Sequence, residues 1–211
     1  MEFQVENTLY PVIVQRKKNK NTYIRVSSHL EIVVSTSYFT TNRQILDLLE
    51  KNRNSVEKMV YRQKLEKQKE EEFYYLGSIY DIIIVPTIEE TTIDGSYIYT
   101  KSKKMLDSWY QKQMKSLFME HLIKEYQKFE EKIPFPKLKI RKMKTRWGVC
   151  NKRDTSVTLN ASLMRETVEC LDYVIVHELS HLVHFDHSKA FWSTVDKYCP
   201  NYKEIRKKLK E

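Results

Sequence analysis

The sequence has few cysteines and no long apolar run. Its 211 residues include three cysteines, Cys150, Cys170 and Cys199, which are widely spaced and form no C-x-x-C pair. An odd number of scattered cysteines argues against a disulfide framework and against a zinc finger, and it favours reduced thiols. No apolar run is long enough to span a bilayer, and residues 1–7 lack the basic and apolar regions of a signal peptide. We therefore expect a cytoplasmic protein without a membrane partner.

The sequence has fewer acidic than basic residues. The chain has 37 Lys and Arg against 28 Asp and Glu, a formal net charge of +9. Basic residues concentrate at Arg16–Lys20, Lys137–Arg146 and Arg206–Lys210. Such stripes can contact phosphates, so nucleic acid is a candidate partner through residues 137–146, and an acidic protein substrate would use the same charge. The alternative is that these faces are only solvated, because no recognised nucleic-acid-binding fold is present.

The first half of the chain alternates between strand and helix patterns. Residues 8–40 alternate apolar and polar side chains, and a helical pattern begins at Thr41–Asn42. Residues 73–86 and 97–99 return to the strand pattern. We find no internal repeat and no low-complexity linker. These patterns predict an α+β fold whose N-terminal α/β lobe, rich in strands, covers residues 1–102.

The second half begins with a long helical pattern. Apolar residues recur at helical steps over Lys103–Lys132, and two prolines then end the helix. Strands are predicted at Lys137–Lys144 and Ser156–Asn160. We expect a second lobe over residues 103–211, or one continuous domain, because a chain of this length permits either.

Four of the six histidines lie within residues 173–192, and two of them belong to a metal-binding motif. His177-Glu178-Leu179-Ser180-His181 fits the pattern H-E-x-x-H. On a helix, residues four apart are offset by about 40° and about 6 Å of rise, so both imidazoles can reach one metal ion. Glu178 can instead address a water molecule at that metal. The metal lowers the pKa of the water and the carboxylate takes and returns its proton, which suits hydrolysis.

The segment that carries the motif has the pattern of a buried helix. Thr167 is a suitable N-cap, and Glu169 lies in the first turn, where the helix dipole favours an anion. No Gly or Pro interrupts residues 167–198. We expect the helix to end near Phe185–Asp186. Its apolar residues recur at three- and four-residue steps: Val168, Leu171, Val174, Ile175, Leu179, Leu182 and Val183.

A catalytic zinc site has three protein ligands and leaves one position for water. We predict His187 as the third ligand, because a bend after the helix would return it to the metal, and Ser188 would then cap the next helix. His184 lies about 10 Å from His177 along the helix axis, too far for both to bind one ion. Its alternative roles are a helix C-terminal position, a hydrogen bond donated to a residue that binds the metal, or a substrate contact. His121, alone on its helix, is predicted to be a polar or half-buried residue.

Two alternatives to a catalytic metal site are open for this motif. H-E-x-x-H arises by chance in many soluble proteins, but here it lies on an amphipathic helix with a third His at a usable spacing. A purely structural zinc would close its fourth position with Cys or His and would not need Glu178. Among catalytic sites, that of a metzincin requires Gly where His184 stands and a later Met-turn, so this class fits poorly.

These motifs resemble the YgjP-like metallopeptidase family of predicted zinc hydrolases, and the spacing with a downstream Phe-Trp is similar to that of the WLM and SprT-like proteases. The match is strongest over about residues 140–205 and looser in the first half, where Tyr75-Leu76-Gly77 is its clearest part. Val149 replaces the Ser that is usual in the family. The matching blocks are, in order, Lys144-Thr145-Arg146-Trp147-Gly148-Val149-Cys150, Leu159-Asn160, Leu171-Asp172-Tyr173-Val174-Ile175, the H-E-x-x-H segment with His187, Phe191 and Trp192, and Cys199-Pro200-Asn201-Tyr202.

The resemblance implies a zincin-like core, in which the active-site helix packs on a small sheet, within residues 103–211. It also implies His177, His181 and His187 as ligands of one Zn²⁺ per chain and Glu178 as the general base.

Two functions follow from these observations. The first is a zinc-dependent metallopeptidase acting on a peptide or protein substrate. Arg146, Asn160 and Tyr173 are its candidates for contacting the substrate or the developing oxyanion, because they lie in or near the motif blocks. The second is a nucleic-acid-associated binding module in which the three-histidine site is structural or vestigial.

Overall fold

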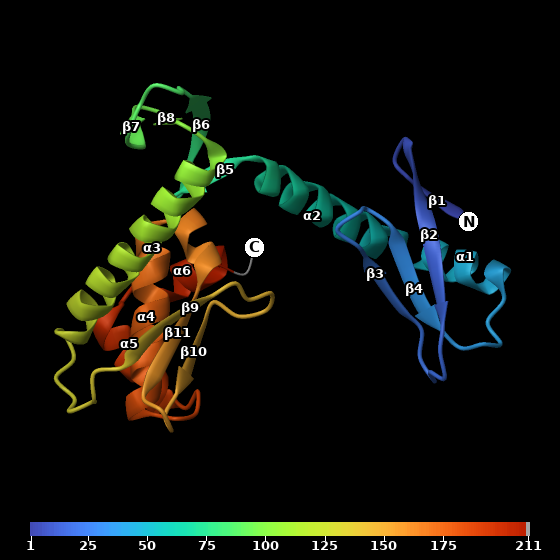
Figure 1. Ribbon diagram of the computed structural model, residues 1–211. Coiled ribbons are helices and arrows are strands. Elements are labelled where there is room, and N and C mark those ends of the chain that lie inside the picture. Colours follow the sequence, from blue (N-terminus) through green and yellow to red (C-terminus); the bar gives the residue numbers. More distant parts are fainter. Residues whose placement is uncertain (210–211) are drawn as a thin grey trace. The chain divides into compact units, whose positions relative to one another are not determined.

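The computed structural model describes residues 1–209, apart from the side chains of residues 66 and 69–71 (Figure 1). The chain is a mixed α+β protein that forms two compact units, Met1–Glu72 and a second unit that begins at Phe73. Within the described residues, none of the helices combines the length and the apolarity that a membrane span requires. Lys210, part of the basic segment expected from the sequence, lies outside the described residues.

The first unit is a four-stranded sheet with two helices. The sheet has the order β1-β2-β4-β3, in which the central pair β2 and β4 is parallel and the outer pairs are antiparallel. Thr41 caps the first helix and forms a capping box with Gln44. The elements are β1 (Glu2–Val5), β2 (Thr8–Arg16), β3 (Tyr23–Val26), β4 (Ile32–Thr36), α1 (Asn42–Lys51) and α2 (Arg53–Glu71).

The second unit contains two small sheets and the remaining helices. One sheet has the order β5-β6-β8-β7 and the other the order β10-β11-β9. Helix α3 is shorter than predicted and ends at Tyr126, before the two prolines. The elements are β5 (Phe73–Tyr75), β6 (Ser78–Ile84), β7 (Thr92–Asp94), β8 (Tyr97–Thr100), α3 (Lys103–Tyr126), β9 (Lys137–Arg141), β10 (Gly148–Asn151), β11 (Ser156–Asn160), the 3-10 helix η1 (Ala161–Arg165), α4 (Val168–Val183), α5 (Lys189–Tyr198) and α6 (Tyr202–Lys208).

The two four-stranded sheets share one topology, so the expectation that the chain has no internal repeat was wrong. In both sheets an antiparallel hairpin is followed by a parallel pair and a second antiparallel pair. The register of the first hairpin is also the same, with Phe3 opposite Tyr10 and Phe73 opposite Tyr80. The repeat escaped detection because the connections within the two sheets differ in length and few side chains are identical.

The boundary between the units falls after Glu72, rather than after residue 102 as predicted. The contacts of β5 and the turn after it with the rest of the second unit include two hydrogen bonds and one close packing contact. The Leu76 N–H donates a hydrogen bond to the Met164 carbonyl oxygen at 2.8 Å, and the Tyr110 hydroxyl donates to the Tyr74 carbonyl oxygen at 3.2 Å. At Gly77, with φ of +84°, an added Cβ would lie 2.7 Å from Thr167, so this turn packs against the start of α4. Strand patterns alone do not reveal such contacts.

Helix α4 is the centre of the core of the second unit. Figure 1 shows it lying between α3 and the sheet of β9, β10 and β11. Its buried side chains include Leu171, Ile175 and Leu179, and they pack with Phe118 of α3 and Leu159 of β11. The expected packing of this helix on a small sheet is therefore observed. The sequence patterns did not predict strand β10. It begins at Gly148, the last residue of the Arg146-Trp147-Gly148 block.

Candidate metal centre

Helix α4 ends where the three histidines require a bend. Its N-cap is Thr167, as predicted, although the Thr167 side chain makes no capping hydrogen bond. The last helical residue is Val183, and His184 has an extended backbone with φ of −121° and ψ of 123°. The helix therefore ends two residues earlier than predicted. Ser188 caps α5 through a hydrogen bond from the Phe191 N–H, as the sequence indicated.

The bend brings His187 beside His177 and His181. One nitrogen of each imidazole lies within 4.8 Å of the others, and the Nε2 atoms of His177 and His187 are 3.3 Å apart. Zinc–nitrogen bonds of about 2.0–2.1 Å in a tetrahedral site place two ligand nitrogens about 3.3–3.4 Å apart. The His177–His187 pair therefore has the spacing of two ligands of one metal ion, and a ring nitrogen of His181 lies within 4.8 Å of both. His184 and His121 are not part of a three-residue group of this kind among the described residues.

Hydrogen bonding leaves His181 with a free nitrogen for a metal. The Nδ1 atom of His181 lies 3.3 Å from the His184 carbonyl oxygen. Because a carbonyl oxygen only accepts, Nδ1 carries the hydrogen, and the Nε2 lone pair of His181 stays available. His184 thus lies at the end of α4, one of the roles considered for it, and its backbone carbonyl accepts a hydrogen bond from His181 rather than donating one.

Burial keeps His177 neutral. Removal from water, followed by the neighbouring His181 and His187, lowers the pKa of His177 to about 3. Neutral imidazole is the form that binds a metal ion. The Nδ1 atom of His177 is buried without a hydrogen-bond partner among the described residues.

Two aromatic residues of α5 form one wall of the centre. Phe191 is fully buried, and its ring centroid lies 4.5–4.9 Å from those of the three histidines. Trp192 stacks on His187 with a centroid distance of 5.6 Å and an interplanar angle of 21°. The Phe-Trp pair downstream of His187 therefore holds the imidazoles in place by ring contacts.

Glu178 is buried in the floor of the site, with 4% of its surface exposed. Burial raises the pKa of its carboxyl to about 8, although a hydrogen bond from the Cys150 backbone N–H and the positive charge of Arg146 act in the opposite direction. Gly148 lies directly against this side chain. A Cβ added at Gly148 would be 2.5 Å from the Glu178 Oε1 atom and 2.7 Å from its Cγ atom. Strand β10 can therefore approach the carboxylate this closely only because residue 148 is glycine.

The histidines and Glu178 open into a cavity of about 580 Å³. Of the three predicted substrate contacts, Arg146 and Tyr173 line it. Burial raises the pKa of the Tyr173 hydroxyl to about 12, so this phenol is neutral and can donate a hydrogen bond. The other lining residues are Thr145, Trp147, Gly148, Val149, Cys150, Val174, Phe185, Arg206 and Leu209.

Asn160 does not contact this cavity in the described residues, contrary to prediction. Its side-chain amide donates to the carbonyl oxygens of Met143 and Arg146, both at 2.8 Å, and its oxygen accepts from the N–H groups of Met143 and Ser162. All of its hydrogen-bonding capacity is therefore used by the backbone. Asn160 fixes the loop before β10, which places Arg146 and Trp147 at the cavity.

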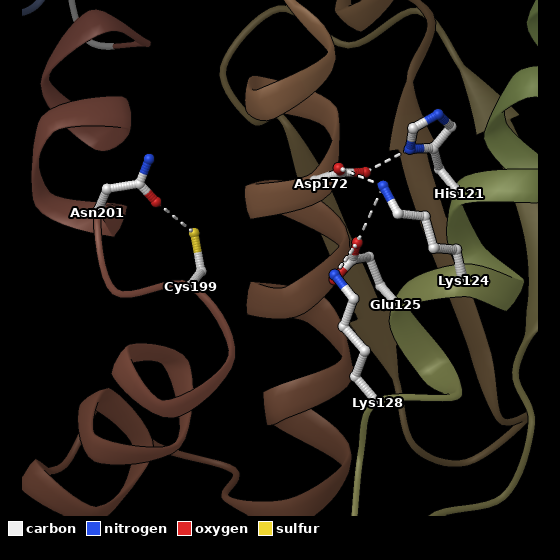
Figure 2. A network of polar contacts seen from close by, with 7 residues as sticks. All are labelled: His121, Lys124, Glu125, Lys128, Asp172, Cys199 and Asn201. Carbon is white, nitrogen blue, oxygen red and sulfur yellow. Dashed lines mark hydrogen bonds and ion pairs between the residues drawn. The ribbon is translucent and has the colours of Figure 1, made fainter.

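A separate polar network joins α4 to α3 (Figure 2). His121 of α3 is buried, and its Nδ1 atom lies 2.5 Å from the Asp172 Oδ1 atom of α4. Lys124 contacts the other oxygen of Asp172 at 3.4 Å, and Lys128 pairs with the buried Glu125 at 2.7 Å. His121 is thus a buried partner of Asp172, consistent with the polar role predicted for it.

Sequence reasoning missed two groups at the cavity. Arg206 was noticed only as part of a basic segment, and nothing in the sequence placed it near the histidines. The Cys150 N–H is a backbone group, so no residue type indicates that it donates to Glu178. Both depend on how distant segments pack together.

Comparison with known proteins gives two kinds of match. The model of the family described as YgjP-like, metallopeptidase domain, matches residues 20–211. Among solved structures, the metallopeptidase zymogen of Pyrococcus abyssi abylysin is 24% identical and has a TM-score of 0.36, covering 46% of this chain and 90% of its own. The metallopeptidase zymogen of Methanocaldococcus jannaschii jannalysin is 25% identical with a TM-score of 0.35, covering 46% and 92%. No curated protein sequence gives a significant match.

Proposed function

The chain belongs to the YgjP-like metallopeptidase family, and from this premise we propose that it is a zinc-dependent hydrolase that cleaves peptide bonds. One observation supports the proposal above all others. Three imidazole nitrogens within 4.8 Å of one another and the buried carboxylate of Glu178 open into the same cavity. A purely structural metal has no need of such a carboxylate.

In this proposal His177, His181 and His187 hold one zinc ion per chain. Bound zinc supplies Lewis acidity, which lowers the pKa of water and polarises a scissile carbonyl group. Imidazole ligands suit zinc, but they also accept nickel, cobalt or iron, so the metal itself is part of the proposal.

Glu178 acts as the general base. Its carboxylate takes a proton from the attacking water and returns it to the nitrogen of the leaving amine. A carboxyl with a pKa near neutrality can both accept and release a proton, and burial moves Glu178 in that direction. The hydrogen bond from the Cys150 N–H and the contact with Gly148 hold the carboxylate in one orientation.

Substrate groups around the scissile bond have two candidate partners in the cavity. The neutral hydroxyl of Tyr173 and the guanidinium of Arg146 are both hydrogen-bond donors, as stabilisation of a developing oxyanion requires. Strand β10 lies at one edge of its three-stranded sheet and contacts α4. An extended peptide that pairs with this edge would lie along the cavity.

A nucleic-acid-associated module is the second candidate function. Lys137, Arg141, Lys142 and Lys144 are exposed in or beside β9 and support it, whereas Lys139 is paired with Asp154. This function predicts salt-sensitive oligonucleotide binding that survives removal of the metal. We also propose a cytoplasmic location, which is supported by the unpaired state of all three cysteines.

Metal analysis combined with peptide hydrolysis tests the proposed function. We expect one zinc per chain in the purified protein, lost in His187→Ala and kept in His184→Ala and Glu178→Gln. Glu178→Gln should nevertheless lose hydrolysis of a quenched fluorescent peptide mixture, because the general base is gone. Absence of metal under chelator-free conditions, or its loss only in His184→Ala, would contradict the ligand assignment.

A further inference from the structure

Two arginines at the cavity of the histidines form no ion pair with the described residues. Arg146 and Arg206 line the cavity, and Glu178 is the one carboxylate among its described lining residues. Neither arginine forms an ion pair with any described residue, although both are exposed. Glu178 itself is buried, with its side chain against Gly148.

Some basic residues elsewhere in the second unit are paired, whereas others, such as Lys137 and Lys142, are exposed and form no ion pair with a described residue. The lysines of α3, β9 and α5 that form ion pairs each do so with a nearby carboxylate. Those pairs are Lys124 with Asp172 and Glu125, Lys128 with Glu125, Lys139 with Asp154, and Lys197 with Glu130 and Glu131. Arg146 and Arg206 differ from the other unpaired cations in lining the cavity of the histidines, where they are available for an anion that comes from outside the chain.

Ring stacking positions Arg206 near the histidines. The Cζ atom of Arg206 lies 4.7 Å from the centroid of Trp192, which lies 5.6 Å from the centroid of His187. The sum of these two distances places the Cζ atom of Arg206 no more than about 10 Å from the ring centroid of His187, a predicted metal ligand. Tyr202 stacks on Trp192 at 5.3 Å and is itself buried. A guanidinium held on an aromatic face loses little freedom when it binds a carboxylate.

The basic character continues beyond the cavity. A second hollow of about 490 Å³ shares Arg206 with the metal cavity and is also lined by Lys203, Lys207, Trp192 and Tyr202. No carboxylate is found among its described lining residues. Lys203, Arg206 and Lys207 of α6 thus place three cations at this hollow.

We propose that Arg206 selects peptide substrates that carry a carboxylate within about three residues of the scissile bond. The inference rests on the proposed function and names its substrate class. An extended peptide advances about 3.3–3.6 Å per residue, so a span of about 10 Å corresponds to about three residues. The carboxylate belongs either to an acidic side chain or to the C-terminus of the substrate, and Arg206 binds both through two parallel N–H···O hydrogen bonds.

Arg206 lines both the cavity and the second hollow, so it lies where the two meet. A substrate carboxylate would neutralise its charge at this point. Lys203 and Lys207, which line the second hollow, would then favour further acidic residues of the peptide there.

Binding of matched peptides to the zinc-loaded Glu178→Gln protein tests the inference separately from catalysis. The probes are fluorescein-labelled alanine-based octapeptides in three forms: one Glu with an amidated C-terminus, Gln in its place with a free C-terminus, and Gln with an amidated C-terminus. In the peptides that contain Glu, the position of the Glu residue is varied along the sequence. Affinity is measured by fluorescence anisotropy for the parent and for versions that also carry Arg206→Gln, Arg206→Lys or, as a matched charge control, Arg153→Gln.

The peptide with Gln and an amidated C-terminus has no carboxylate. We expect it to bind about tenfold to a hundredfold more weakly than one of the two peptides that have one, since a hydrogen bond to a charged group contributes about 1.5–3 kcal/mol. Arg206→Gln should abolish this difference, Arg206→Lys should keep part of it, and Arg153→Gln, an exposed residue outside the cavity, should keep all of it. Preference for the Glu form identifies a side-chain carboxylate, and preference for the free C-terminus identifies a terminal one.

Three outcomes would overturn the inference. They are equal affinity for all three peptides, no measurable binding of any peptide at millimolar concentration, and equally tight, Arg206-dependent binding of a single-stranded oligonucleotide. Cleavage by the zinc-loaded wild-type protein distinguishes the two proposals. Carboxylate-dependent binding without cleavage would refute the proposed peptidase function alone, whereas equal cleavage and equal binding of the three forms would refute the selectivity alone.

Discussion

Replacing Glu178 by Gln removes a carboxyl whose pKa is raised by burial from 4.5 to about 8. In the metal-free protein, the folded state therefore binds this proton more tightly than the unfolded state does. The resulting stabilisation is fully present below pH 4.5 and is lost as the pH rises through 8. One pKa unit corresponds to about 1.4 kcal/mol, so the wild-type protein should lose up to about 5 kcal/mol across this range.

The Gln variant keeps a similar shape and can still accept the hydrogen bond from the Cys150 N–H, but it does not titrate. We therefore expect the metal-free Glu178→Gln protein to match the wild type near pH 4.5–5 and to be increasingly more stable toward pH 8. The difference in Tm should reach roughly 10–20 °C. Contributions of the histidines are present in both proteins and cancel in the comparison.

Thermal unfolding followed by circular dichroism, in chelator at pH values from 5 to 8.5, measures this difference. Glu120→Gln, an exposed position on α3, serves as a control for the loss of one carboxyl at the surface. Added zinc should reduce the gap at pH 8, because a cation beside Glu178 favours its ionised form. A Tm difference that stays constant across the whole pH range would refute the reasoning.

Two further predictions concern the packing around the helix of the H-E-x-x-H motif. Gly148→Ala should fold and retain zinc, but its rate of peptide hydrolysis should fall about a hundredfold because the new Cβ displaces the Glu178 carboxylate. An undiminished rate would show that the close contact between residue 148 and Glu178 is unimportant. Asp172→Asn should lower the free energy of unfolding by about 1–3 kcal/mol without loss of bound zinc, since His121 loses a charged partner between α3 and α4. Urea unfolding and metal analysis of the same preparation check the second prediction, and zinc loss in that variant would contradict it.

The elements with strong local patterns were predictable. Helix α4 was located because its apolar residues recur at helical steps, and its N-cap was correct at Thr167. Its end was misplaced by two residues because no local signal makes His184 adopt an extended backbone. Strand β10 was missed, since its four residues are too few to show alternation. The repeated sheet topology was also missed, because it is a property of strand pairing over distant segments.

Local spacing in the sequence is enough to identify the candidate ligands of the metal centre. Spacing of four on a helix places His177 and His181 on one face, and a six-residue step past a helix end can return His187 to them. These relations involve neighbouring residues, so backbone geometry alone defines them. The tertiary structure decided what surrounds the centre. Packing of β10 and α6 against α4 places Gly148 at Glu178 and Arg206 at the cavity, because such contacts join segments that no local periodicity connects.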